Sequence, residues 1–235
     1  MIDKHASDLR EAVEMVRDGD TVLIGGFGEA GNPTELIHAL IEHGARGLTV
    51  VNNNAGNGEI GLARLLKMGR VAKLICSFPR GSHGHIFDAL YKERRIELEL
   101  VPQGTLAERL RAGGAGIPAF FTPTAAGTDL ATDKEVRAFG GRDYVLEHAI
   151  RGNVAFIKAE TADRWGNLTY RKAARNFGPV MAMAAQITVA QVRQVVPLGT
   201  IDPECIVTPS IFVSRIVEVA NPISERDHLE EVYVA

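Results

Sequence analysis

Short apolar segments alternate with amphipathic ones along the first half of the chain. Four segments rich in branched apolar residues predict strands, at residues 21–24, 48–51, 71–76 and 96–101. Apolar residues at helical spacing predict helices before, between and after them, at residues 8–17, 33–44, 60–68, 86–93 and 105–114. Strands and helices that alternate with short connections favour an α/β fold, with an open, mostly parallel sheet and helices on both of its faces.

Two of these helices have clear start and stop signals. Asn32 stands before a proline, which predicts a helix capped by Asn32, and Gly44 is expected to end it. A glutamate three residues after Thr105 completes a capping box, so the next such helix is expected to begin at Thr105. Gly113 and Gly114 are expected to stop it.

From residue 115 onward the pattern changes to short extended pieces and turns. Residues 136–139 and 144–146 are extended in character and lie among prolines and glycines, which predicts a small antiparallel appendage. Later segments are expected to belong to the main sheet, at residues 154–159, 187–192 and 211–219. Because no repeat or polar linker marks a boundary, we expect residues 1–235 to form one domain.

Composition and charge exclude several classes of protein. Apolar residues make up 46% of the chain and charged residues 23%, which is typical of a globular protein. The 26 basic and 29 acidic side chains are interspersed, so no charged surface for nucleic acid or an anionic membrane is indicated. The chain start has no signal-peptide core, and no segment reaches the about 20 apolar residues of a membrane span. Two isolated cysteines, Cys76 and Cys205, indicate neither a disulfide framework nor a zinc site, and we expect a cytoplasmic protein.

Glycine is enriched, at 24 of 235 residues, and part of the excess falls in one loop. Gly26, Gly28 and Gly31 fit the pattern G-x-G-x-x-G between a predicted strand and a predicted helix. Such glycines let the backbone approach a ligand closely, and the following helix offers unpaired N–H groups to an anion such as a pyrophosphate. The alternative, that these glycines only allow a tight turn, stays open.

Amides follow two of the predicted strands. A dinucleotide-binding domain needs an acidic residue after its second strand, whereas this chain has asparagine at 52–54. Gln103 follows the fourth strand, and parallel strands place their carboxyl ends at one sheet edge, so Asn53 and Gln103 are expected to converge there. Amide N–H groups are suitable oxyanion donors. An asparagine-rich turn is the structural alternative.

Three other side chains are weaker candidates. Arg80 lies just after the third strand, where it can pair with a substrate carboxylate or remain a solvated surface residue. His83 and His85 lack the neighbouring acidic residues that would complete a metal site, and we expect no metal.

Several motifs together resemble the A (alpha) subunit of the family I 3-oxoacid CoA-transferases. They lie at residues 22–28, 53–56, 102–109, 112–120, 164–168 and 171–177, and the similarity runs from about residue 5 to residue 215. Within the family, further segments are most similar to the transferases acting on 3-oxoadipate, at residues 57–62, 76–80 and 178–185. The resemblance implies transfer of CoA from succinyl-CoA to a 3-oxo acid, most closely 3-oxoadipate, with acetoacetate or another short-chain 3-oxo acid as the alternative. The CoA thioester is then a substrate, and no cofactor is expected.

The resemblance also implies a second polypeptide. In this family a glutamate of the B subunit, in a Ser-Glu-Asn-Gly type motif, attacks the acyl-CoA. This chain has no such motif. It is therefore expected to be inactive without a B subunit, in a heterodimer or larger heteromer.

Site residues carry over from the family one by one. The glycine loop corresponds to the coenzyme A segment, formed by Gly25, Gly26, Phe27, Gly28, Glu29, Ala30 and Gly31. Asn53 and Gln103 match active-site amides that position the carboxylate and stabilise oxyanions. Arg80 is a hypothesis of our own, as the partner of the distal carboxylate of a dicarboxylic acid.

Two interpretations outside this family compete with it. One is a stand-alone NAD oxidoreductase, against which the missing acidic residue argues. The other is a ligand-sensing domain of the same α/β fold type, but the stretch before residue 21 is too short and too little basic for a DNA-binding segment.

Overall fold

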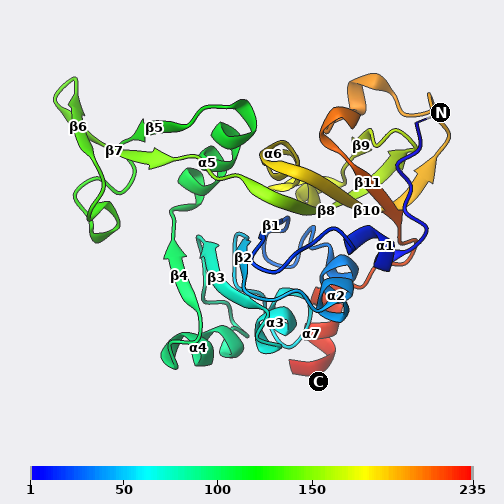
Figure 1. The fold of residues 1–235 in the computed structure, drawn as a ribbon, viewed down its shortest axis with the longest axis horizontal. Coiled ribbons are helices and arrows are strands. Elements are labelled where there is room, and N and C mark those ends of the chain that lie inside the picture. The colour runs from blue at the N-terminus through cyan, green and yellow to red at the C-terminus, as the bar shows by residue number, and fades with distance from the viewer. Residues whose placement is uncertain (1, 234–235) are drawn as a thin grey trace.

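The computed structural model describes residues 2–233, which contain an eight-stranded sheet flanked by helices (Figure 1). Its strands are β1 (Thr21–Ile24), β2 (Leu48–Val51), β3 (Val71–Cys76), β4 (Glu97–Leu100), β8 (Gly152–Asp163), β9 (Leu168–Thr169), β10 (Ala185–Val196) and β11 (Arg215–Glu218). The order across the sheet is β11-β10-β8-β1-β2-β3-β4, with every neighbouring pair parallel. Off this path, β9 pairs antiparallel with β8. The predicted open, mostly parallel sheet is confirmed.

Helices cover both faces of this sheet. They are α1 (Leu9–Val13), α2 (Thr34–His43), α3 (Gly61–Lys67), α4 (His85–Lys92), α5 (Gln103–Ala115), α6 (Gly178–Ala184) and α7 (Glu225–Tyr233). On β1, Val22 and Ile24 pack into the core formed with α1 to α4, whereas Leu23 packs into the core formed with α5 and α6. This alternation makes both faces of the strand apolar, as expected for a doubly covered sheet. None of the helices within residues 2–233 is long and apolar enough to cross a membrane.

The order of the strands places the loop after β1 at a special position. From β1 the chain steps outward through β2, β3 and β4, then returns to the other side of β1 with β8 and continues to β10 and β11. The strand order therefore reverses at β1. In open α/β sheets, the carboxyl ends of the strands at such a reversal form the ligand crevice.

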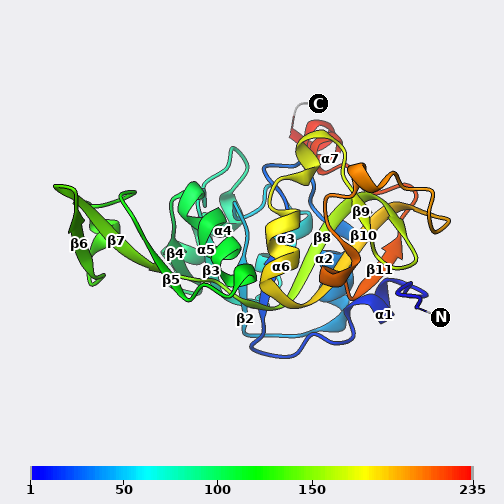
Figure 2. The same cartoon turned by 90° about the horizontal axis from the view of Figure 1, so that it is seen from above.

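The predicted antiparallel appendage is also present. Its three strands are β5 (Ala119–Thr122), β6 (Val136–Phe139) and β7 (Arg142–His148), which pair antiparallel in the order β5-β7-β6. Figures 1 and 2 show this small sheet extending away from the main one. Phe139 contacts Phe121 and Tyr144 edge to face, each with ring centroids 5.4 Å apart, so an aromatic cluster holds the three strands together.

Two predicted helices near the N-terminus differ from those observed. α1 ends at Val13 instead of continuing to residue 17, although Asp8 caps it by accepting from the Glu11 N–H at 2.8 Å. α2 ends at left-handed Gly44, as predicted, but its N-cap is Pro33 rather than Asn32. The Asn32 side chain makes no capping bond, and its Nδ2 instead donates to the Gly28 carbonyl and to Glu225 Oε2, which fixes the orientation of the amide.

The predicted boundaries of the helix at 105–114 are wrong at both ends. α5 begins at Gln103, so Thr105 lies inside its first turn with a buried hydroxyl that has no hydrogen-bond partner within residues 2–233. Gly113 and Gly114 lie inside the helix, which ends at left-handed Gly116. A side chain at 113 would overlap the Ile150 carbonyl, and a Cβ at 114 would lie 2.6 Å from the Met183 Cβ. Close packing explains this glycine pair, not helix termination.

The two cysteines are expected to differ in reactivity. Cys76 is fully buried on β3, and burial raises the pKa of its thiol to about 12, whereas Cys205 is exposed. Because the thiolate is the reactive form, Cys76 is expected to be inert in the folded chain. Titration with a thiol reagent at pH 8 should detect one thiol in the folded chain and both in denaturant. Rapid reaction of folded Cys205→Ser would contradict the burial of Cys76.

Candidate active site

A pocket of about 510 Å³ lies at the carboxyl edge of the main sheet. The loops after β1, β2 and β3 and the first residue of α5 line it. Their lining residues are Phe27, Gly28, Glu29, Asn53, Asn54, Asn57, Ser77, Phe78, Gly81, Ser82 and Gln103. A second hollow of about 330 Å³ adjoins it and also includes Phe27 and Gln103. A larger hollow of about 570 Å³ lies elsewhere, between α1 and α2, away from the predicted site residues.

The structure brings the two predicted amides together. Gln103 Nε2 donates to Asn53 Oδ1 at 2.8 Å, and Ser77 Oγ donates to the same oxygen at 2.7 Å. Because Asn53 Oδ1 accepts both of these hydrogen bonds, the Nδ2 group of the same side chain is left as a donor. Asn53 Nδ2 has no hydrogen-bond partner among the described residues. The arrangement is suited to donating to an oxyanion in the pocket, and the catalytic role of both amides stays a prediction.

The three consecutive asparagines have different structural roles. Asn52 is buried, and its Nδ2 donates to the Ile24 carbonyl at 2.8 Å, which links the end of β2 to the end of β1. Asn54 Oδ1 accepts from the Gly56 N–H at 2.8 Å, which closes an Asx turn. These two asparagines fit the turn alternative, and Asn53 between them is held by Ser77 and Gln103.

The glycine loop is fixed by contacts within the chain. Asn176 Oδ1 accepts from the Gly26 N–H at 3.1 Å, and Asn176 Nδ2 donates to the Ala30 carbonyl at 3.0 Å. A Cβ on Gly31 would lie 2.6 Å from the Ala174 carbonyl oxygen. Gly28 has a φ of +57°, borders the pocket and has open space where a Cβ would stand. Tight packing therefore accounts for Gly31, and Gly28 is the glycine that a ligand can approach.

The first turn of α2 is not open to an anion, contrary to expectation. Thr34 is fully buried, and its hydroxyl donates to Glu225 Oε1 at 2.7 Å. The backbone N–H of Leu36 lies 3.4 Å from Gln191 Oε1. A carboxylate of the chain itself thus lies where a pyrophosphate was expected, because the C-terminal segment folds back over this turn.

Comparison with known proteins assigns the family. Residues 6–219 match the family model of coenzyme A transferase. The chain belongs to the coenzyme A transferase family. This membership favours the transferase interpretation over an NAD oxidoreductase or a ligand-sensing domain.

Relatives in this family match nearly the whole chain. The A subunit of the 3-oxoadipate CoA-transferase of Pseudomonas putida is 60% identical over 220 residues, which cover 94% of this chain and 95% of that one. The A subunit of a succinyl-CoA:3-ketoacid coenzyme A transferase of Xanthomonas campestris is 49% identical over 220 residues, covering 93% and 90%. Their designation as A subunits implies a further subunit in those enzymes.

A solved structure supports the fold. An acyl-CoA transferase from E. coli O157:H7, in a thioester complex with CoA, superposes with a TM-score of 0.85 at 22% identity. The match covers 94% of this chain and 51% of that one, so this coenzyme A transferase chain spans about half of the longer one.

The other predicted candidates lie outside the pocket. Arg80 is 76% exposed, with Nε 3.5 Å from Asp88 Oδ1. The His83 ring stacks on Tyr233 with centroids 4.4 Å apart, and His85 Nε2 lies 3.9 Å from Glu59 Oε1. Across residues 2–233, no three His, Cys, Asp or Glu side chains are grouped so that they could hold a metal ion.

Sequence reasoning did not single out Ser77, Asn57 or Asn176 as site residues. Ser77 directly follows β3, so the rule that pointed to Asn53 and Gln103 applies to it equally. Asn57 Nδ2 donates to Glu29 Oε1 at 2.8 Å and borders the pocket. Asn176 reaches the glycine loop from 150 residues away, and no local spacing indicates that contact.

Proposed function

We propose that this chain is the A subunit of a CoA-transferase that moves CoA from succinyl-CoA to 3-oxoadipate. The observation that carries the proposal is the 60% identity to the A subunit of the Pseudomonas putida 3-oxoadipate CoA-transferase over nearly the full length of both chains. The Asn53–Gln103 pair at the sheet edge supports it. Acetoacetate or another short-chain 3-oxo acid is the second candidate acceptor, because relatives such as the Xanthomonas campestris protein act on 3-ketoacids by name.

The reaction fits a ping-pong mechanism. A glutamate carboxylate attacks the thioester carbonyl of succinyl-CoA, and the carbon–sulfur bond breaks to give a mixed anhydride and the CoA thiolate. The thiolate attacks the glutamyl carbonyl, releasing succinate and leaving a glutamyl-CoA thioester. The same steps in reverse pass CoA to 3-oxoadipate and regenerate the glutamate.

Each attack in this sequence places negative charge on a former carbonyl oxygen. Asn53 Nδ2 and the remaining N–H of Gln103 are donors at the pocket that can receive this charge. Because Ser77 and Gln103 hold the Asn53 oxygen, the donor is preorganised and needs little reorientation during the reaction. One such donor contributes about 10²-fold to 10³-fold to the rate in known enzymes.

The nucleophile is proposed to come from a B subunit. The one carboxylate lining the pocket among the described residues is Glu29, which is exposed and accepts from Asn57. Exposure leaves this carboxylate hydrated, which makes it a weak nucleophile. We therefore propose a heteromer with a B subunit, active in the cytoplasm without a further cofactor, and expect this chain to be inactive alone.

Arg80 is proposed to select dicarboxylic acceptors. Its contact with Asp88 joins two exposed side chains and is weak, so the guanidinium is free to turn toward a ligand at the same loop. Arg80→Ala is expected to lower kcat/KM for 3-oxoadipate about tenfold while changing kcat/KM for acetoacetate less than about twofold. Steady-state kinetics of the assembled enzyme measure both values. Equal losses for the two acids would show that Arg80 is not the selector.

The acceptor is tested by co-purifying the chain with its B subunit, followed by assays of both acids with succinyl-CoA. We expect kcat/KM for 3-oxoadipate to exceed that for acetoacetate at least about tenfold. The opposite preference would support the second candidate. No transfer to any short 3-oxo acid would overturn the proposed function.

A further inference from the structure

The C-terminal helix lies over the loops that form the pocket. α7 follows the residues that match the family, 6–219, and its first residue contacts the first residue of α2 and the first residue of α3 (Figure 1). The Leu229 Cδ2 atom lies 2.6 Å from the point where a Cβ on Gly58 would stand, in the loop after β2. Tyr233 stacks on His83 in the loop after β3. Thus α7 contacts two of the three loops through these side chains.

Glu225, the first residue of α7, reaches the third loop. It is only 6% exposed, and its Oε2 accepts from Asn32 Nδ2 at 2.6 Å while Oε1 accepts from the Thr34 hydroxyl. A side chain at Gly61 would overlap this carboxylate, so it lies directly against the start of α3. A buried carboxylate is costly without donors, and here each oxygen has one.

Asn32 connects the Glu225 carboxylate to the glycine loop. Its Nδ2 donates to the Gly28 carbonyl at 3.1 Å as well as to Glu225. Asn54 Nδ2 donates to the same carbonyl at 3.3 Å. A Cβ on Gly26 would overlap the Asn32 side chain, so the Asn32 amide lies in direct contact with the backbone of the glycine loop at Gly26. Gly28, the glycine that borders the pocket, is therefore held by an amide that Glu225 orients.

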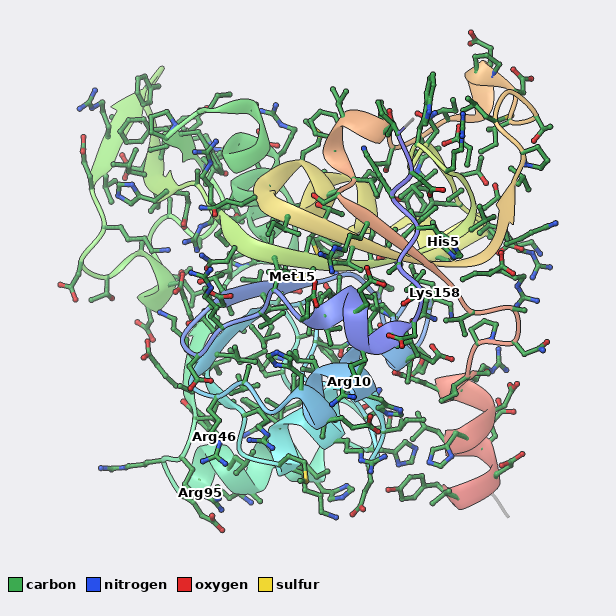
Figure 3. All side chains as sticks on the ribbon, turned by 45° about the vertical axis from the view of Figure 1, so that its right-hand side comes forward. His5, Arg10, Met15, Arg46, Arg95 and Lys158 are labelled. Carbon is green, nitrogen blue, oxygen red and sulfur yellow. The ribbon has the colours of Figure 1, made fainter. Side chains whose placement is uncertain are left out.

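A backbone hydrogen bond joins the C-terminal segment to α2 near a partly buried lysine. Lys158 of β8, labelled in Figure 3, is near both Glu35 and Glu225, and their carboxylates oppose the lowering of its pKa by burial. Glu35 Oε1 accepts from the Ile223 N–H just before α7. The segment is thus bound to α2 both at its backbone and through the Glu225 carboxylate.

We propose that Glu225 is a positioning residue that sets the shape of the glycine loop for the CoA thioester. The inference rests on the proposed function, because that loop is assigned to the thioester there. Glu225 itself does not line the pocket. It acts through Asn32 on Gly28, and its loss leaves the Asn32 amide free to turn away.

The test compares three variants of the enzyme assembled with its B subunit. Glu225→Ala is expected to raise KM for succinyl-CoA about tenfold, the effect of losing a hydrogen bond to a charged group, with kcat within about twofold. Glu225→Gln keeps the size of the side chain and one acceptor oxygen, so the expected rise is about threefold. Glu231→Ala removes an exposed glutamate of the same helix and is expected to leave KM unchanged. A merely structural role would lower the amount of active enzyme and leave KM unchanged in all three.

Hydrogen exchange separates this inference from the proposed function. Without any substrate, residues 25–32 of the assembled complex are expected to exchange faster in Glu225→Gln and Glu225→Ala than in Glu231→Ala. If the enzyme transfers CoA to another acid and not to 3-oxoadipate, the proposed acceptor is wrong, but the positioning role of Glu225 can still be tested. KM for succinyl-CoA is then measured with that other acid as acceptor. Unchanged KM together with unchanged exchange in Glu225→Gln would overturn the positioning role, even if Glu225→Ala fails to fold.

Discussion

Asn53→Asp is expected to lower kcat of the assembled enzyme about 10³-fold. The substitution keeps the size and shape of the side chain, and one carboxylate oxygen can still accept from Ser77 and Gln103 as Oδ1 does now. The other oxygen replaces the Nδ2 donor. An anionic oxygen then faces the developing oxyanion in place of an N–H group, so the loss of a donor is compounded by repulsion. Steady-state kinetics with saturating succinyl-CoA and 3-oxoadipate measure the change.

The matched control is Asn221→Asp, which makes the same chemical change at an exposed position. Its kcat is expected to stay within about twofold of the original, because Asn221 does not line the pocket and an exposed charge is screened by salt. Thermal unfolding of both variants shows whether the chain remains folded. If folded Asn53→Asp retained kcat within about tenfold, Asn53 would not be an oxyanion donor.

Gln103→Ala is expected to lower kcat about 10²-fold. The substitution removes one donor at the pocket and also the 2.8 Å hydrogen bond that helps to orient Asn53. The helix itself should persist, because alanine is a good helix former at the first position of α5. Gln186→Ala, at an exposed position of β10, is the matched control and is expected to have an unchanged kcat.

A double variant distinguishes the two roles of Gln103. If Gln103 acts mainly by orienting Asn53, Gln103→Ala added to Asn53→Ala should cost far less than it does alone. If it donates to the oxyanion itself, the two losses should be closer to additive. An unchanged rate in Gln103→Ala would remove Gln103 from the mechanism.

The sheet and the amide pair are predictable from the sequence for the same physical reason. A strand buried on both faces must be apolar along its length, so β1, β2 and β3 stand out locally. Once these strands are parallel, their carboxyl ends share one edge, and a residue directly after each strand must lie there. Asn53 follows β2 and Gln103 follows β4, so the rule places both at this edge, whereas their 2.8 Å contact is known only from the structure.

The parts that escape prediction depend on contacts between distant segments. Glu225 covers the first turn of α2 from 191 residues away, and so changes the expected anion site into an internal contact. Gly113 and Gly114 have the local pattern of a helix stop, whereas Ile150 and Met183 require glycine there for packing. Local signals cannot distinguish a glycine that ends a helix from one that lets another segment approach.

The most direct test of the assignment compares CoA transfer from succinyl-CoA to 3-oxoadipate by three preparations: this chain alone, the isolated B subunit, and the assembled pair. We expect transfer only by the assembled pair, because in the proposed mechanism this chain supplies the amides and the glycine loop and the partner supplies the nucleophilic glutamate. Transfer by this chain alone at the rate of the assembled pair would contradict the assignment, since the nucleophile would then lie within these 235 residues.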